Sequence, residues 1–94
     1  TLTAVLALLA MVAPAANADI PDEVWDYVYQ YSSVVCAVID GGVADGHPED
    51  AVYGVWQGVQ EDGFTSTEAA EVILLSVRTE CPQNQAVMDE IMNS

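Results

Sequence analysis

The two cysteines of this 94-residue chain, Cys36 and Cys81, lie 45 positions apart in two segments with helical patterning. In a short exported chain an even number of cysteines predicts a disulfide, and we expect Cys36 and Cys81 to be joined. A ring of this size stabilises the folded state by about 4 kcal/mol, because it restricts the unfolded chain. The alternative is a pair of free or metal-bound thiols. Neither cysteine belongs to a C-x-x-C motif, and the only histidine, His47, has no ligand-like spacing to them.

The first eighteen residues have the pattern of a signal peptide. Residues 2–12 form an almost unbroken apolar run, which leads into a small-residue A-x-A site and predicts cleavage after Ala18. The run is too short for a membrane span of about twenty apolar residues, and an uncleaved N-terminal anchor is the alternative interpretation. Because the chain begins without a methionine or a basic residue, we take the leader to be truncated. We expect a signal peptide at 1–18 and a single helical domain at 19–94, secreted or located in the cell envelope.

The charge of the chain is strongly one-sided. Fifteen acidic residues face a single base, Arg78, which gives a formal net charge of −14. Such a surface repels the phosphates of nucleic acids and of anionic lipids, so nucleic acid is excluded as a partner. Arg78 is expected to pair with a carboxylate; a structural role is the favoured interpretation, and part of a recognition site is the alternative. With 52% hydrophobic residues the chain has enough apolar side chains to form a core, so disorder is not expected.

A first helix is predicted from residue 19 to residue 40. Asp19 is a candidate cap, Pro21 suits the first turn, and acidic residues follow where the helix dipole favours them. Gly41 and Gly42 are expected to stop this helix. Its polar strip is narrow, which predicts a central helix with neighbours on two sides. The apolar residues on its broad face are Val24, Tyr27, Val28, Tyr31, Val35, Val38 and Ile39.

A second helix is predicted from residue 49 to residue 61, with a stop at Gly63. Its apolar residues keep the spacing of one buried face, and two glycines, Gly54 and Gly58, fall on another face. Each glycine costs about 1 kcal/mol relative to alanine inside a helix. We expect the pair to let a neighbouring backbone or aromatic ring approach closely.

A third helix opens with a capping box, in which Thr65 is the N-cap and Glu68 the third helical residue. Pro82 disfavours helical geometry at the preceding residue, so this helix should end at Cys81 or one residue sooner. A short last helix is predicted from a cap at Asn84 to about residue 92. The sequence therefore predicts an all-α fold, a small bundle of three main helices plus a short C-terminal helix, held by one disulfide.

Four acidic residues around the first loop are weak candidates for a Ca²⁺ site. Their spacing does not match the EF-hand, which needs acids at alternate positions and a closing glutamate. A solvated acidic loop is the favoured interpretation. We therefore predict no metal site and no cofactor. The four residues are Asp40, Asp45, Glu49 and Asp50.

Catalytic residues are not indicated by any pattern in the chain. His47 is the one group that titrates near neutrality, but no second histidine and no free nucleophile accompany it. No serine lies in a G-x-S-x-G motif. The aromatic residues Trp25, Tyr53 and Trp56 have helical spacing, which is more typical of a core than of a ligand groove.

A weak sign of an interface comes from three apolar residues outside the predicted core faces. Val72 and Leu75 are expected to point away from the centre of the third helix. Together with Met92 they form a candidate exposed apolar patch, although some apolar exposure is ordinary in a small domain.

Two motifs are the most specific in the chain: a cysteine shortly before an acidic residue and glycine, and a Cys-Pro pair after a helix. They lie in residues 35–42 (VCAVIDGG) and 77–82 (VRTECP), with GFTSTEAA at 63–70 between them. Over residues 22–83 the chain resembles a family of small exported helical proteins of mycobacteria and their phages, catalogued as a domain of unknown function. The resemblance implies a helical domain, secreted or in the envelope, with the two cysteines bonded, and it implies no activity.

The sequence thus predicts an exported, non-enzymatic interaction module, which presents an acidic surface to an envelope or extracellular protein. The alternative is a small-ligand or lipid carrier. Its pocket would lie between helices and be lined by Trp25, Trp56 and the tyrosines. No stable membrane span is expected once the leader is removed.

Overall fold

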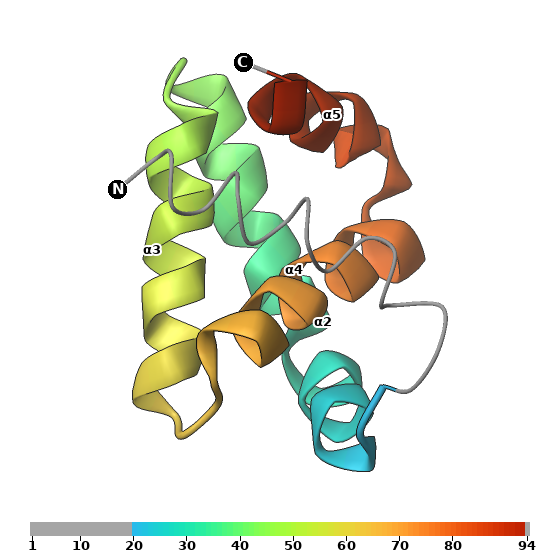
Figure 1. The fold of residues 1–94 in the computed structure, drawn as a ribbon. Coiled ribbons are helices and arrows are strands. Elements are labelled where there is room, and N and C mark those ends of the chain that lie inside the picture. Colours follow the sequence, from blue (N-terminus) through green and yellow to red (C-terminus); the bar gives the residue numbers. More distant parts are fainter. Residues whose placement is uncertain (1–19, 94) are drawn as a thin grey trace.

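The computed structural model describes residues 20–93, which form four α-helices and one short 3-10 helix (Figure 1). The predicted all-α bundle of three main helices and a short C-terminal helix is confirmed. None of the described helices combines the length and apolar character needed to cross a membrane. The leader, its cleavage site and the candidate cap Asp19 lie outside the described residues. The elements are α2 (Asp22–Ala44), α3 (Pro48–Glu61), α4 (Ser66–Glu80), η1 (Pro82–Asn84) and α5 (Gln85–Asn93).

Helix α2 packs against both α3 and α4, which confirms its two predicted neighbours (Figure 1). The prediction that α2 is the central helix is wrong, because α4 is the helix that is buried on all sides. Two residues of its expected inward face, Tyr31 and Val38, are nevertheless exposed. The apolar arc of α2 is wider than its two neighbours cover. The residues of α2 that are buried in the core are Val24, Val28, Val35, Cys36 and Ile39.

The predicted stop of α2 at Gly41 and Gly42 is wrong, since the helix continues through both glycines. A side chain at Gly42 would overlap the Ala51 methyl group and lie 3.1 Å from the His47 carbonyl oxygen. Glycine at this position therefore lets the start of α3 lie close against the end of α2. The chain turns instead at Gly46, whose φ of 78° is a conformation that side chains disfavour.

Helix α3 has almost the predicted bounds and is followed by Gly63, with a φ of 105°. Val52 and Val59 anchor it in the core. The expected close approach of a neighbour to Gly54 and Gly58 is wrong. No atom of the described residues lies within 4 Å of the place where a Cβ would stand at either residue.

The capping box that opens α4 is confirmed. The Glu68 backbone N–H donates to Thr65 Oγ1 at 3.1 Å, and the Thr65 N–H donates to Glu68 Oε1 at 2.9 Å. The helix ends one residue before Cys81, as the following proline predicted. The capping box and the proline thus set both ends of the helix.

Helix α4 is buried on all sides over residues 69–77. Val72 and Leu75 belong to the core, so the prediction that they form an exposed patch is wrong. The side chain of Met92, the third member of that patch, lies outside the described part of the chain. A helical wheel shows which residues share a face, but it does not show how many faces neighbouring elements cover.

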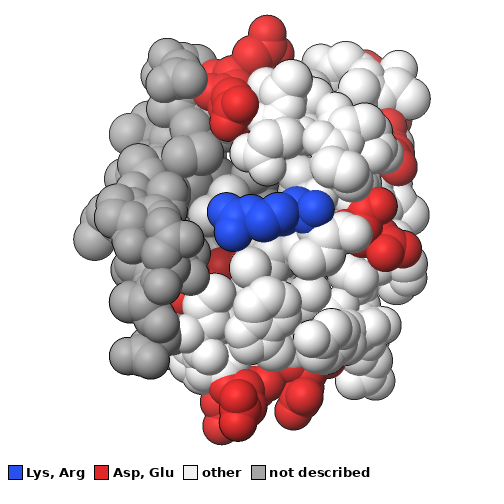
Figure 2. Space-filling model, turned by 90° about the vertical axis from the view of Figure 1, so that its right-hand side faces the viewer, with Lys and Arg blue, Asp and Glu red and all other residues white. Residues whose placement is uncertain are grey.

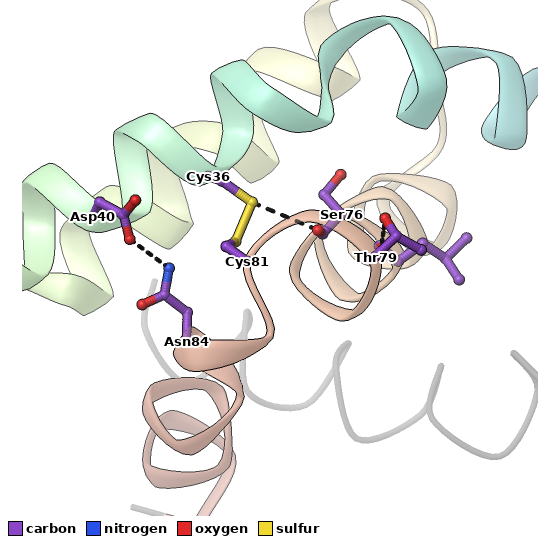
Figure 3. Close-up of a disulfide and its surroundings, with 7 residues drawn as sticks. Cys36, Asp40, Ser76, Thr79, Cys81 and Asn84 are labelled. Atoms are coloured by element: carbon purple, nitrogen blue, oxygen red, sulfur yellow. Dashed lines mark hydrogen bonds between the residues drawn. A yellow bond between two sulfur atoms is a disulfide. The ribbon is translucent and has the colours of Figure 1, made fainter.

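The predicted disulfide joins α2 to the segment after α4 (Figure 3). The S–S distance between Cys36 and Cys81 is 2.08 Å and their Cα atoms are 5.9 Å apart. One helical turn further along α2, Asp40 Oδ1 accepts a hydrogen bond of 2.7 Å from Asn84 Nδ2. Asn84, expected to cap the last helix, is the final residue of η1, and its buried side chain crosses to α2. The disulfide and this hydrogen bond therefore attach the segment between α4 and α5 to α2.

Candidate functional site

A groove of about 260 Å³, open to solvent, runs between α2 and α3. Three apolar side chains of α2 line it while remaining exposed: Tyr31 by 37%, Val34 by 56% and Val38 by 43%. They follow one another at helical spacing, so they form a continuous stripe along α2. A stripe of large apolar residues that the protein itself leaves uncovered is a candidate binding surface.

The α3 side of the groove is formed at Gly54 and Gly58, one helical turn apart. Because neither glycine has a neighbour within 4 Å of its Cβ position, packing inside the bundle does not require a residue without a side chain. Both glycines nevertheless cost helix stability, about 1 kcal/mol each relative to alanine. Their effect on the surface is to keep the groove open and to expose the backbone of α3.

One end of the groove is held by an aromatic cluster and a carboxylate. The Tyr27 hydroxyl donates to Asp62 Oδ2 at 2.7 Å. The Tyr27 ring lies 4.6 Å from that of Tyr31 and meets Phe64 edge-on at 5.1 Å, between ring centroids. Burial, followed by the hydrogen bond to Asp62, raises the pKa of Tyr27, so its hydroxyl remains a donor. The Asp62 carboxylate is thereby fixed at the end of the groove.

The weak metal candidates do not form a metal site in the part of the chain described. No group of three or more His, Cys, Asp and Glu residues that could hold a metal ion occurs there. Asp40 is engaged by Asn84, and Asp45 ends α2 as its C-cap. Glu49 and Asp50 belong to the first turn of α3, where the helix dipole stabilises negative charge.

His47 is exposed and immediately precedes α3. Its backbone carbonyl oxygen accepts a bond of 3.4 Å from the N–H of Ala51, and its side chain does not cap the helix. His47 is therefore an exposed loop residue at the start of a helix.

The tryptophans do not line the groove. Trp56 packs on Tyr53 with ring centroids 5.6 Å apart, and its Nε1 donates to the Ser66 carbonyl oxygen at 3.0 Å. Trp25 is partly buried against the core on α2. The aromatic residues of the groove are Tyr27 and Tyr31, so neither Trp25 nor Trp56 contributes to it.

Two polar residues on α4 are buried. Burial, followed by the nearby Glu68 carboxylate, raises the pKa of Glu71. The Ser76 hydroxyl is buried and has no hydrogen-bond partner among the described residues. The Ser76 carbonyl oxygen lies 3.5 Å from Cys36 Sγ (Figure 3), a contact and not a hydrogen bond, because a disulfide sulfur has no proton to donate. A serine beside a disulfide has no base to activate it. No sequence pattern had marked either residue as buried.

The expected ion pair of Arg78 is not found among residues 20–93. Arg78 is exposed, and no carboxylate pairs with it among the described residues. The face in Figure 2 shows the one basic side chain on a largely uncharged surface, with acidic side chains gathered toward the edges. A helical residue pairs with partners three or four positions away, and none of those positions is acidic here. They are Leu74, Leu75, Cys81 and Pro82.

The acidic side chains therefore remain without a compensating base inside the described part of the chain. Eleven of the fourteen acidic residues described there are exposed, two are half-buried and one, Glu71, is buried. Most of the negative charge thus lies on the surface, where no described base neutralises it and a basic partner can reach it.

No known family model matches the chain, and neither curated proteins nor solved structures give a significant match. The resemblance to the mycobacterial family of unknown function accordingly stays a prediction.

Proposed function

We propose that this protein is an exported, non-enzymatic interaction module that binds a basic protein partner in the cell envelope or extracellular space. The observation that carries the proposal is the uncompensated negative charge: a net charge of −14, with the only base unpaired in the described residues. A surface of this kind accelerates association with a positively charged partner and rejects acidic ones. The disulfide supports the compartment, because such bonds persist in oxidising surroundings outside the cytoplasm.

A small-ligand or lipid carrier receives less support from the geometry. The groove is open along its length, and its volume of about 260 Å³ is below the roughly 300–1,000 Å³ that is usual for small-molecule sites. An anionic lipid headgroup would also meet a surface of the same sign. An open groove suits a protein segment better than a lipid, because a protein segment can keep a polar face in water, whereas the acyl chain of a lipid is apolar on all sides.

The proposal is tested by capturing partners from an envelope extract on the immobilised mature protein at low and at high salt. Each captured protein is then purified, and its binding is measured directly. We expect a partner with a basic surface whose affinity falls as salt rises, since salt screens exposed charges. An extract from which no protein binds reproducibly at low salt would refute the proposal, as would a purified partner that is acidic and insensitive to salt.

A further inference from the structure

We infer that the groove between α2 and α3 is a docking site for an α-helix of the partner protein, with a small or apolar face between two basic residues about three turns apart. This inference rests on the proposed function and names its binding surface. It combines three features: the apolar wall of the groove, its glycines, and the acids beside it, of which Asp62 lines the groove and Asp50 and Glu61 border the glycines.

The apolar wall matches one face of a helix in character and length. From Tyr27 to Val38 the α2 side spans twelve residues, whose ends are about 16 Å apart at a rise of 1.5 Å per residue. That length accommodates three turns of a partner helix. Helix-in-groove recognition uses such an apolar strip to bury residues at helical spacing on the partner.

The glycines permit a close approach. Gly54 and Gly58 present bare backbone, and the space above them is open. A helix with small side chains can therefore lie nearer to α3 than it could to a surface of leucines or valines. The bundle itself does not use this space, which explains how two unfavourable helix residues are tolerated: the approach they permit is to another molecule.

The acids at the ends of the groove specify the charge of the partner. At 100° per residue, positions 50, 54, 58 and 61 fall within one narrow strip of α3. Asp50 and Glu61 thus border the two glycines along α3; both are exposed, and neither lines the groove itself. Asp62 stands at the second end, fixed by Tyr27. The two ends are eleven residues apart along α3, or about 16 Å. A Lys or Arg at each end of the partner helix would meet them.

The same charges disfavour the other possible occupants. A second copy of this chain would bring another net charge of −14 to the groove, and its only base is Arg78. The carboxylate of a fatty acid would be repelled by the acidic residues beside the groove. Much of its acyl chain would also stay in contact with water, because the groove is open. A basic helix from a different protein is the occupant that satisfies both the apolar wall and the rims.

The inference is tested with two synthetic 17-residue helices of alanine and leucine, labelled with a fluorophore. One carries lysines eleven residues apart, and the other carries glutamates at the same positions. Binding to the mature, oxidised protein is followed by fluorescence anisotropy at low and high salt. We expect the lysine peptide to bind at least about tenfold more tightly than the glutamate peptide, with a difference that shrinks as salt screens the charges.

The variant Gly54→Leu/Gly58→Leu fills the groove without straining the fold, because both Cβ positions are open and leucine favours helix. We expect an equal or higher melting temperature and at least a tenfold loss of affinity for the lysine peptide. The matched control is Ala37→Leu, an exposed position of α2 that does not line the groove. It should bind as the wild type does.

A second pair of variants tests the rims. Asp50→Asn/Glu61→Gln should weaken the lysine peptide several-fold and reduce the salt dependence. Glu80→Gln/Asp89→Asn removes the same charge from exposed residues of α4 and α5, two helices that contribute no residue to the groove, and should have a smaller effect. Equal effects of the two pairs would show that general charge, and not the groove rims, attracts the peptide.

The outcomes separate this inference from the proposed function. Salt-dependent binding that survives in Gly54→Leu/Gly58→Leu overturns the docking site but leaves the acidic interaction module standing. Failure of the lysine peptide to bind at low salt overturns the helix as occupant, and only a failed capture of partners removes the function as well. A wild-type dimer in sedimentation that the glycine variant abolishes would assign the groove to a second copy. A fatty acid probe that is lost in the same variant would assign it to a carrier.

Discussion

Removal of the disulfide by Cys36→Ala/Cys81→Ala should destabilise the domain strongly. The bond closes a ring of 46 residues, counted as the separation of 45 plus one. In the loop-entropy model a ring of that size contributes about 4 kcal/mol to the free energy of unfolding. Both cysteines are also buried, so the lost sulfurs add a smaller packing term of the same sign.

The loss is large relative to the whole stability. A domain of about 75 residues has a free energy of unfolding of roughly 4–11 kcal/mol, at 0.05–0.15 kcal/mol per residue. The loss of about 4 kcal/mol should lower the melting temperature by about 15–30 °C, since 1 kcal/mol shifts a domain of this size by 4–8 °C. We therefore expect the variant to be partly unfolded at 37 °C, while the oxidised wild type is folded.

The assay is urea unfolding followed by far-ultraviolet circular dichroism. Opening of the ring lets the unfolded chain expand, so the m-value should rise together with the loss of stability. The control Val35→Ala removes core packing from the neighbouring position and keeps the ring, so its m-value should not change. A loss below about 1 kcal/mol, or free thiols in the native wild type on alkylation, would refute the reasoning.

Four smaller effects follow from single contacts and from the total charge. Asn84→Ala should cost about 1–2 kcal/mol in urea unfolding, because it removes a hydrogen bond to the Asp40 carboxylate; no loss would mean that water replaces the bond without cost. Ser76→Ala should raise the melting temperature by several degrees, because it removes a buried hydroxyl without a partner, and a lower melting temperature would contradict this. Burial raises the pKa of Glu71 above its ordinary 4.5, so ionisation of Glu71 lowers the free energy of unfolding. The domain has its full stability below the pKa of Glu71 in the unfolded chain, and it loses part of that stability as pH rises through the pKa in the folded state. Glu71→Gln should therefore be more stable than wild type at pH 7 and similar below about pH 4.5, whereas the exposed control Glu80→Gln should show no such crossover. Moderate salt should raise the melting temperature of the wild type, since it screens the net charge of −14, and a fall would show that the repulsion is weak.

Local signals in the sequence predicted the helix ends where a side chain or a proline acts on its own backbone. Thr65 and Glu68 form the capping box because both partners lie within one turn. Pro82 ends α4 because its ring restricts the preceding residue. The disulfide was predictable for a different reason: only two cysteines exist, so only one pairing within the chain is possible.

Signals that depend on tertiary contacts were not readable from the sequence. Gly42 resembles a helix stop, yet it serves as the point where Ala51 of α3 lies against α2. Val72 and Leu75 lie off the predicted inner face of α4 but are buried. In both cases the missing information is which neighbour lies next to the residue, and periodicity within one helix does not contain it.

The groove was only half predictable. Its glycines were recognised as unusual, but the expected neighbour above them is absent from the described part of the chain. Tyr31 and Val38 were assigned to the buried face because a broad apolar arc is ordinarily covered. Both errors concern residues that line the same groove, where apolar side chains of α2 and the glycines of α3 are left uncovered by the described part of the chain.

The ring closed by the two sulfurs contains all of α3 and α4, together with the loops that join them. A peptidase that cuts one bond between residues 37 and 80 would consequently leave one covalent molecule, heavier by a single water. Both walls of the groove would stay attached to each other through Cys36 and Cys81. In the extracellular location proposed above, where peptidases act, the crosslink would thus keep the groove assembled after the backbone has been cut once.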